Sequence, residues 1–208
     1  MAVQERALRT RNALIEAAAA LFDRDGFETV SLAAISAHAG VSNGALHFHF
    51  ASKAALADAV REAAARRLRR ITEDGPARRG ALQTLVDASH ALARGFQDDV
   101  VLRAGFDLEE DPDSSRVGGD LHREWQSWVE AAFARADREG ALMRGVSAQD
   151  AALMVVGAMT GFEELGGQDA RWLSSATLTG FWALLLPRLA HGPVLDQLVA
   201  SGTAPEAH

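Results

Sequence analysis

Apolar residues recur every three or four positions along most of this chain, which is the period of an amphipathic helix. The first stripe ends at Gly26 and comprises Leu14, Ala17, Ala18, Leu21 and Phe22. Further stripes predict helices over about 53–72, 82–96, 100–108, 125–139, 148–164 and 172–186. We therefore predict an all-α fold.

Positions 30 to 53 predict two short helices joined by a glycine turn. Ser31 and Ser42 lie eleven residues apart, and each hydroxyl can cap the helix that follows it. Val30 and Ile35 occupy the positions of a hydrophobic staple around the first cap. Gly40 lacks a Cβ and so can take the left-handed conformation that ends one helix and redirects the chain. The segment is therefore typical of a helix-turn-helix.

The second helix of this pair, from Asn43 to about Phe50, carries the candidate DNA-reading residues. Leu46 and Phe50 are four positions apart and are predicted to face a core. Small residues allow close approach to a duplex, and Asn and His hydrogen-bond with base edges or phosphates. The side chains predicted to face outward are those of Asn43, Gly44, Ala45, His47 and His49.

Ser52 predicts the cap of the next helix and places Lys53, the only lysine of the chain, in its first turn. Two interpretations of Lys53 stay open: a flexible charge for a phosphate oxygen, or an ordinary surface residue. For His47 and His49 the alternative to DNA contact is a solvated helix face. Residues two apart on a helix point in different directions, which disfavours a metal site.

These residues resemble the helix-turn-helix of the tetracycline-repressor (TetR) family. The string GALxFHFxSK is similar to the family's butyrolactone-autoregulator receptor branch, although that family usually has Tyr where this chain has His47. The resemblance implies a DNA-binding domain over 1–55, a connector helix to about 72, and a ligand-binding and dimerisation domain over 73–208. The matching residues are Ile35, Ala39, Gly40, Val41, Ser42, Gly44, Ala45, Leu46, Phe48, His49, Phe50, Ser52, Lys53 and Leu56.

The charge is divided unevenly along the chain. Residues 1–70 contain ten Lys and Arg and seven Asp and Glu. The remainder contains eleven Lys and Arg and twenty-one Asp and Glu. The basic end is therefore the predicted nucleic-acid end, and an acidic remainder discourages non-specific coating of DNA.

Two tryptophans, Trp125 and Trp128, lie within one turn of a predicted helix. Each can serve as ordinary core, or line a cavity in which its indole N–H meets a ligand carbonyl. The resemblance implies a ligand-contacting tryptophan at this place, and Trp125 matches better than Trp128. Helical facing adds Phe106, Val155 and Met159 to the predicted ligand site.

The helices predicted over 148–164 and 172–186 are apolar over more than one stripe, so each needs cover on two sides. We expect a homodimer through these helices, with Gly157, Ala158 and Gly161 permitting close approach. Two copies of the helix-turn-helix would then read a pseudo-palindromic operator. We expect the final SGTAPEAH, from Ser201, to be frayed.

Together these features predict a ligand-responsive repressor that a small apolar effector releases from double-stranded DNA. A pseudo-receptor that responds to an antibiotic or to no ligand stays an alternative, as does a scaffold without DNA affinity. We expect that the protein is not an enzyme, since Cys and Tyr are absent and no nucleophile has a recognisable base partner. We expect no catalytic residues, cofactor or metal, and a cytoplasmic location without a membrane partner.

Overall fold

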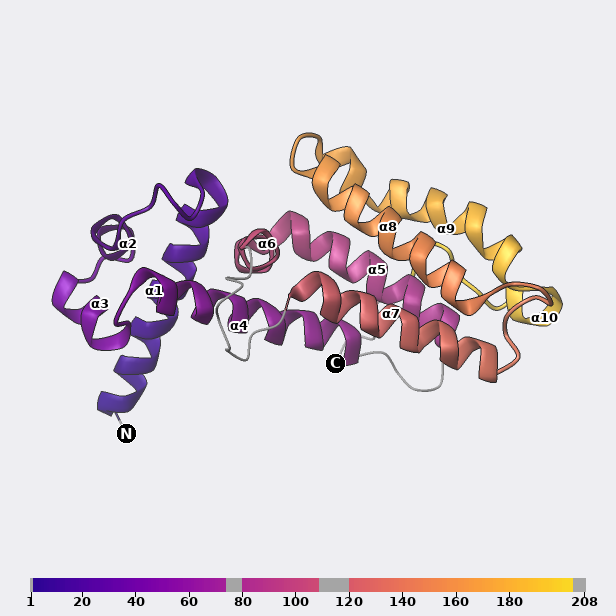
Figure 1. Cartoon of the computed structure of the whole chain (residues 1–208), viewed down its shortest axis with the longest axis horizontal. Coiled ribbons are helices and arrows are strands. Elements are labelled where there is room, and N and C mark those ends of the chain that lie inside the picture. The colour runs from indigo at the N-terminus through magenta and orange to yellow at the C-terminus, as the bar shows by residue number, and fades with distance from the viewer. Residues whose placement is uncertain (1, 74–79, 109–119, 204–208) are drawn as a thin grey trace. The chain divides into compact units, whose positions relative to one another are not determined.

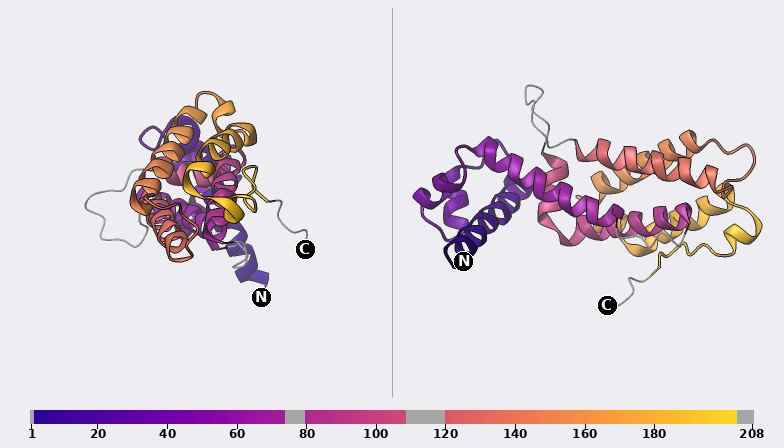
Figure 2. Two further views of the ribbon diagram at one scale, coloured as in Figure 1. Left: turned by 90° about the vertical axis from the view of Figure 1, so that its right-hand side faces the viewer. Right: turned by 90° about the horizontal axis from the view of Figure 1, so that it is seen from below.

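The computed structural model describes residues 2–73, 80–108 and 120–203, and every regular element in them is helical (Figure 1). The all-α prediction is confirmed, and Figure 2 shows the same segments from two other directions. None of the described helices combines the length and apolarity needed to cross a bilayer. The elements are α1 (Ala2–Asp25), α2 (Leu32–His38), α3 (Asn43–His49), α4 (Lys53–Glu73), α5 (Ala81–Asp98), α6 (Val100–Asp107), α7 (Leu121–Arg138), α8 (Ala148–Gly166), η1 (Ala170–Leu173), α9 (Ser175–Leu189) and α10 (Gly192–Leu195).

The chain divides into two units by internal contacts. The N-terminal unit comprises Met1–Arg67 with Asp99–Leu121, and the C-terminal unit comprises Leu68–Asp98 with His122–His208. In the N-terminal unit α1 contacts α2, α3 and α6, so the helix-turn-helix and α6 share one supporting helix. Its buried apolar residues include Leu14, Ile15, Ala18, Phe22, Ile35, Leu46, Phe50, Leu56 and Val60.

Two arginines bind α6 to the rest of the N-terminal unit. Arg103 donates from Nε and Nη2 to the two carboxylate oxygens of Asp23 on α1, at 3.0 and 3.2 Å. This hydrogen-bonded partner raises the pKa of Arg103, so the guanidinium stays charged. At the start of α6, the Asp99 carboxylate caps Val101 N–H and lies 2.9 Å from Arg67 on α4. Helix α6 therefore joins α1 and α4 through charged as well as apolar contacts.

Helix α5 is the most enclosed helix of the C-terminal unit, where it contacts α8, η1 and α9 (Figure 1).

The last long helix begins three residues later than its apolar pattern predicts. Ser174 accepts a hydrogen bond from Thr177 N–H at 3.2 Å and so caps α9, while Trp172 lies in the preceding η1 turn. A local serine cap thus overrides the longer apolar run.

The predicted fraying from Ser201 onward is wrong for residues 201–203, while 204–208 lie outside the described residues. The Gln83 amide exchanges two hydrogen bonds with the Val199 backbone, at 2.8 and 3.2 Å. Asp87 accepts from Thr203 N–H at 2.7 Å and from its hydroxyl at 2.6 Å. Polar side chains of α5 therefore hold this end of the chain in place.

Candidate nucleic-acid interface

Side-chain caps start both helices of the predicted DNA-reading pair. Ala34 N–H donates to the Ser31 hydroxyl at 3.1 Å, and Ala45 N–H donates to the Ser42 hydroxyl at 3.2 Å. Both predicted caps are confirmed. Each serine accepts with its oxygen, so its own O–H remains a donor that can point toward a phosphate.

Gly40 makes the turn between the two helices. Its φ is +67°, and nothing lies within 4 Å of a Cβ built there, so backbone conformation rather than space requires glycine. Gly40 N–H donates to Ala37 carbonyl at 3.1 Å, and Val41 N–H donates to Ser36 carbonyl at 3.0 Å. These two bonds form a Schellman motif, which ends α2 and directs the chain into α3.

Helix α3 buries one side and exposes the other. Leu46 and Phe50 are buried as predicted, and Arg11 of α1 lies over the Phe50 ring with its guanidinium carbon 5.3 Å from the centroid. The predicted DNA-binding residues fall into two groups. Those exposed to solvent are Ser31, Ser42, Asn43, Gly44 and His47, and those half-buried are Ala45, His49 and Lys53.

The periodicity argument missed Phe48, whose side chain is 81% exposed. Phe48 lies two positions from Leu46 and two from Phe50 and therefore points away from both, a signal that the sequence contained. Its ring packs edge-on against that of His49, with centroids 5.2 Å apart. Phe48 was thus overlooked because it is an apolar residue on the side of α3 that otherwise carries small and polar residues.

The side chains of Asn43 and Lys53 already have partners within the N-terminal unit. The Ser36 hydroxyl donates to the Asn43 amide oxygen at 3.2 Å, which joins α2 to α3. Lys53 Nζ donates to the carbonyls of Phe27 and Glu28, at 2.8 and 3.1 Å, and lies 4.4 Å from the Phe27 ring centroid. An ammonium has three N–H donors, so one of them remains for a phosphate.

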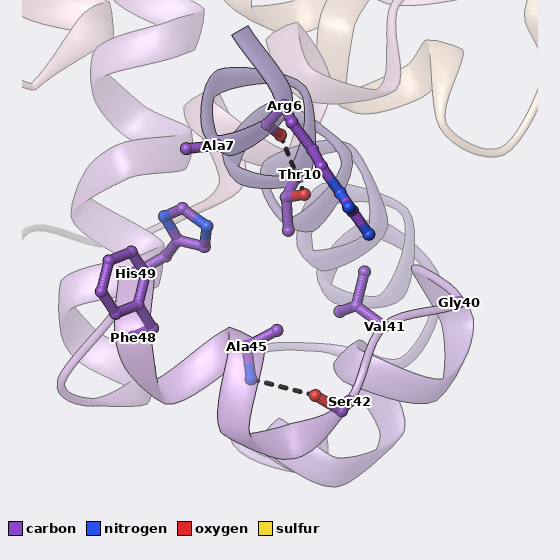
Figure 3. Close-up of a pocket in the computed structure, with 9 residues that line it drawn as sticks. All are labelled: Arg6, Ala7, Thr10, Gly40, Val41, Ser42, Ala45, Phe48 and His49. Atoms are coloured by element: carbon purple, nitrogen blue, oxygen red, sulfur yellow. Dashed lines mark hydrogen bonds between the residues drawn. The ribbon is translucent and has the colours of Figure 1, made fainter. Parts of the chain in front are cut away.

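Helices α1 and α3 border a groove of about 560 Å³ (Figure 3). Arg6 and Thr10 approach it from α1, and Ala45 and Phe48 from α3. Val41 and Ser42, among others, also line it. The groove therefore adds a cationic and a hydroxyl side chain of α1 to the surface that α3 presents.

The predicted ligand-binding residues are distributed over both units. Phe106 is buried on α6 in the N-terminal unit, whereas Val155 and Met159 are buried on α8 in the C-terminal unit. Trp125 and Trp128 of α7 stack with ring centroids 5.2 Å apart. The structure therefore brings the two tryptophans together, and the grouping of all five residues stays a prediction.

Two indole N–H groups of the C-terminal unit are buried without a hydrogen-bond partner among the described residues. They belong to Trp125, which is 2% exposed, and to Trp182, which is fully buried. A buried donor without an acceptor is destabilising, so each of these groups can gain from a ligand acceptor. Sequence reasoning missed Trp182 because its apolar neighbours indicated core.

Comparisons with known proteins agree with this geometry. Residues 14–60 match the family described as bacterial regulatory proteins, tetR family. The A-factor receptor protein of Streptomyces griseus is 29% identical over 97% of this chain and 71% of that protein. The crystal structure of a gamma-butyrolactone receptor, described as ArpA-like, is 30% identical, covers 94% of this chain and 96% of that one, and has a TM-score of 0.78. The chain belongs to the TetR family.

A second structure of this family extends the likeness to a protein bound to DNA. It is CprB of Streptomyces coelicolor in complex with its biological operator sequence, which is 31% identical, covers 89% of this chain and 90% of that one, and has a TM-score of 0.74. This TetR-family chain is therefore a DNA-binding transcriptional regulator of the butyrolactone-receptor-like branch, and not an enzyme.

Proposed function

We propose that this regulator is a repressor that binds a pseudo-palindromic operator as a homodimer and leaves it when a small apolar effector binds. The observation that carries the proposal is the capped pair α2 and α3, whose outer face is exposed while its inner face is buried. The operator complex of CprB and the butyrolactone receptor support the two halves of this proposal.

In the proposed complex α3 enters the major groove with Asn43 through His49. The hydroxyls of Ser31 and Ser42 are exposed at two helix N-termini, where phosphate is favoured. His47 is exposed on the same helix, and Lys53 keeps one donor. These four residues would clamp the DNA backbone, while the remaining outer residues of α3 approach base edges.

Exposed apolar surface supports the homodimer. Leu153 and Met154 on α8 are more than half exposed, and Leu184 on α9 is 81% exposed. Gly157 and Gly161 have nothing within 4 Å of a built Cβ, although each costs a helix about 1 kcal/mol relative to Ala. A second copy of this chain would cover these side chains and use the space at the glycines. The two helix-turn-helix pairs of the dimer would then meet half-sites roughly 34 Å apart.

The effector would satisfy the buried indole N–H of Trp125, so it must carry a hydrogen-bond acceptor such as a lactone carbonyl. Release requires the effector to bind the DNA-free state more tightly than the DNA-bound state. A shift from nearly all bound to nearly all free needs about 5.5 kcal/mol of differential binding. Equal affinity for both states would leave the DNA bound.

The test measures operator binding by fluorescence anisotropy with duplexes from DNA flanking the protein's own gene, and then titrates butyrolactones of varied chain length. We expect Trp125→Phe, which keeps a smaller aromatic ring and removes the N–H, to preserve operator affinity and to lose release by butyrolactone. Trp128→Phe is the matched comparison, because the Trp128 ring is only half-buried and its indole N–H is not one of the buried donors without a partner. Loss of both properties in the Trp125 variant would make this residue structural. Release by none of the compounds would favour a pseudo-receptor.

A further inference from the structure

Phe48 is an apolar side chain that the fold does not use. Its neighbours Leu46 and Phe50 fill the core behind α3, whereas the Phe48 ring is 81% exposed. Among the described residues of the N-terminal unit it is the most exposed of the large apolar side chains. An exposed phenyl ring gains free energy only when a partner covers it.

The outer face of α3 carries few polar groups that can discriminate between bases. An asparagine reads adenine with its amide oxygen and an amide N–H, and the Asn43 oxygen already accepts a hydrogen bond from the Ser36 hydroxyl, which leaves one of its two lone pairs for a base. Gly44 and Ala45 have no polar side-chain atoms. The remaining Asn43 N–H donors suit acceptors that several bases share. Apart from Asn43 and His49, direct reading by this helix therefore depends on apolar contact.

Ala45 and Phe48 are three positions apart, so they share a side of the helix. Figure 3 shows both on the side of α3 that lines the groove beside α1. In the major groove, the apolar group that distinguishes one base is the C5 methyl of thymine, and alanine and phenylalanine are side chains that contact it. The exposed strip and the thymine methyl are therefore chemically complementary.

We infer that Phe48, supported by Ala45, reads a thymine methyl in each half-site and is a specificity-determining residue of this regulator. The inference rests on the proposed function, because it requires α3 to lie in the major groove. It assigns base discrimination to a contact that removes apolar surface from water. It also predicts that the operator contains a thymine whose C5 methyl contributes more to binding than the hydrogen-bonding groups of that base pair.

The test begins with selection of an operator from a random-sequence duplex library by the wild-type chain. Each thymine of the selected operator is then replaced singly by deoxyuridine, which removes the methyl and leaves every hydrogen-bonding group unchanged. We expect one thymine in each half-site to be sensitive. Loss of its methyl should weaken binding about fourfold, and loss of both symmetry-related methyls about fifteenfold, since a buried methylene contributes about this factor.

Two variants assign the effect to the ring. Phe48→Ala should bind thymine and deoxyuridine operators equally, and Phe48→Leu should keep a preference for thymine. His47→Ala is the control: it should weaken binding to both operators to the same extent, because a phosphate contact carries no base information. Thermal unfolding of Phe48→Ala should match that of wild type, since the ring is exposed.

A wild-type chain that tolerates deoxyuridine at every position would overturn the inference and leave the proposed function standing. A Phe48→Ala variant that keeps the full deoxyuridine penalty would overturn it as well. If the wild-type chain enriches no sequence from the library at low salt, the proposed function itself fails. The selection and the titrations that follow it distinguish these three results.

Discussion

Substitution of Gly105 by alanine tests how closely α6 packs within the N-terminal unit. A Cβ on Gly105 would lie 2.2 Å from the Cβ of Ala64 on α4 and 3.3 Å from Leu121 Cδ1. The Ala64 methyl is fixed to the helix backbone, whose Cα lies 3.7 Å away, and Ala64 is fully buried. Neither helix can relieve this contact by rotating a side chain.

The expected change in the free energy of unfolding for Gly105→Ala follows from two opposing effects. Alanine stabilises a helix interior by about 1 kcal/mol relative to glycine. Overpacking of a close-packed site costs about 1–3 kcal/mol, and carbon atoms at optimal contact are about 3.5–4.0 Å apart. Because a distance of 2.2 Å between the two Cβ atoms is far shorter than that contact distance, steric strain outweighs the helix gain. We expect Gly105→Ala to lower the free energy of unfolding by about 1–2 kcal/mol.

Urea denaturation of four proteins provides the assay: wild type, Gly105→Ala, Ala64→Gly and the double variant. The double variant exchanges the positions of one methyl group, so it restores the space that the single substitution removes. We expect a coupling free energy of about 1–3 kcal/mol between the two sites. Additive effects, or a Gly105→Ala protein as stable as wild type, would refute the close approach of α6 and α4.

Three further substitutions test single interactions. Ser42→Ala should lower the free energy of unfolding by about 1 kcal/mol because α3 loses its cap, as urea denaturation would show. Lys53→Met should reduce the slope of log affinity against log salt by about 0.9 if its third donor contacts a phosphate, and an unchanged slope would limit Lys53 to its carbonyl contacts. Gln83→Leu should free the segment at Val199, which hydrogen exchange of that backbone would report as lost protection; retained protection would assign the docking to Asp87 and His90.

The helix-turn-helix was predictable because its signals are local. The Ser31 and Ser42 caps each join atoms three residues apart, and the Gly40 turn depends on the conformation of one residue. The outward direction of Phe48 also follows from helical spacing. It was missed because only small and polar side chains were assigned to the outer face, not because the sequence lacked the information.

Local patterns were less reliable where a polar contact competes with an apolar stripe. The stripe that includes Trp172 predicts too early a start for α9, because the Ser174 cap begins that helix. The segment from Ser201 has a composition typical of a frayed end. Its docking depends on Asp87, which lies 116 residues before Thr203, and no local window contains that pair.

The sequence by itself determined the all-α fold and the capped helix pair, because capping and helical periodicity act within a few residues. Only the tertiary structure decided that α6 belongs with the N-terminal unit through Arg103 and Asp23, which are 80 residues apart. It also decided that Lys53 binds carbonyls 25 and 26 residues away and that the indole N–H of Trp125 lacks an acceptor. Such partners are chosen by how distant segments pack, which no spacing rule encodes.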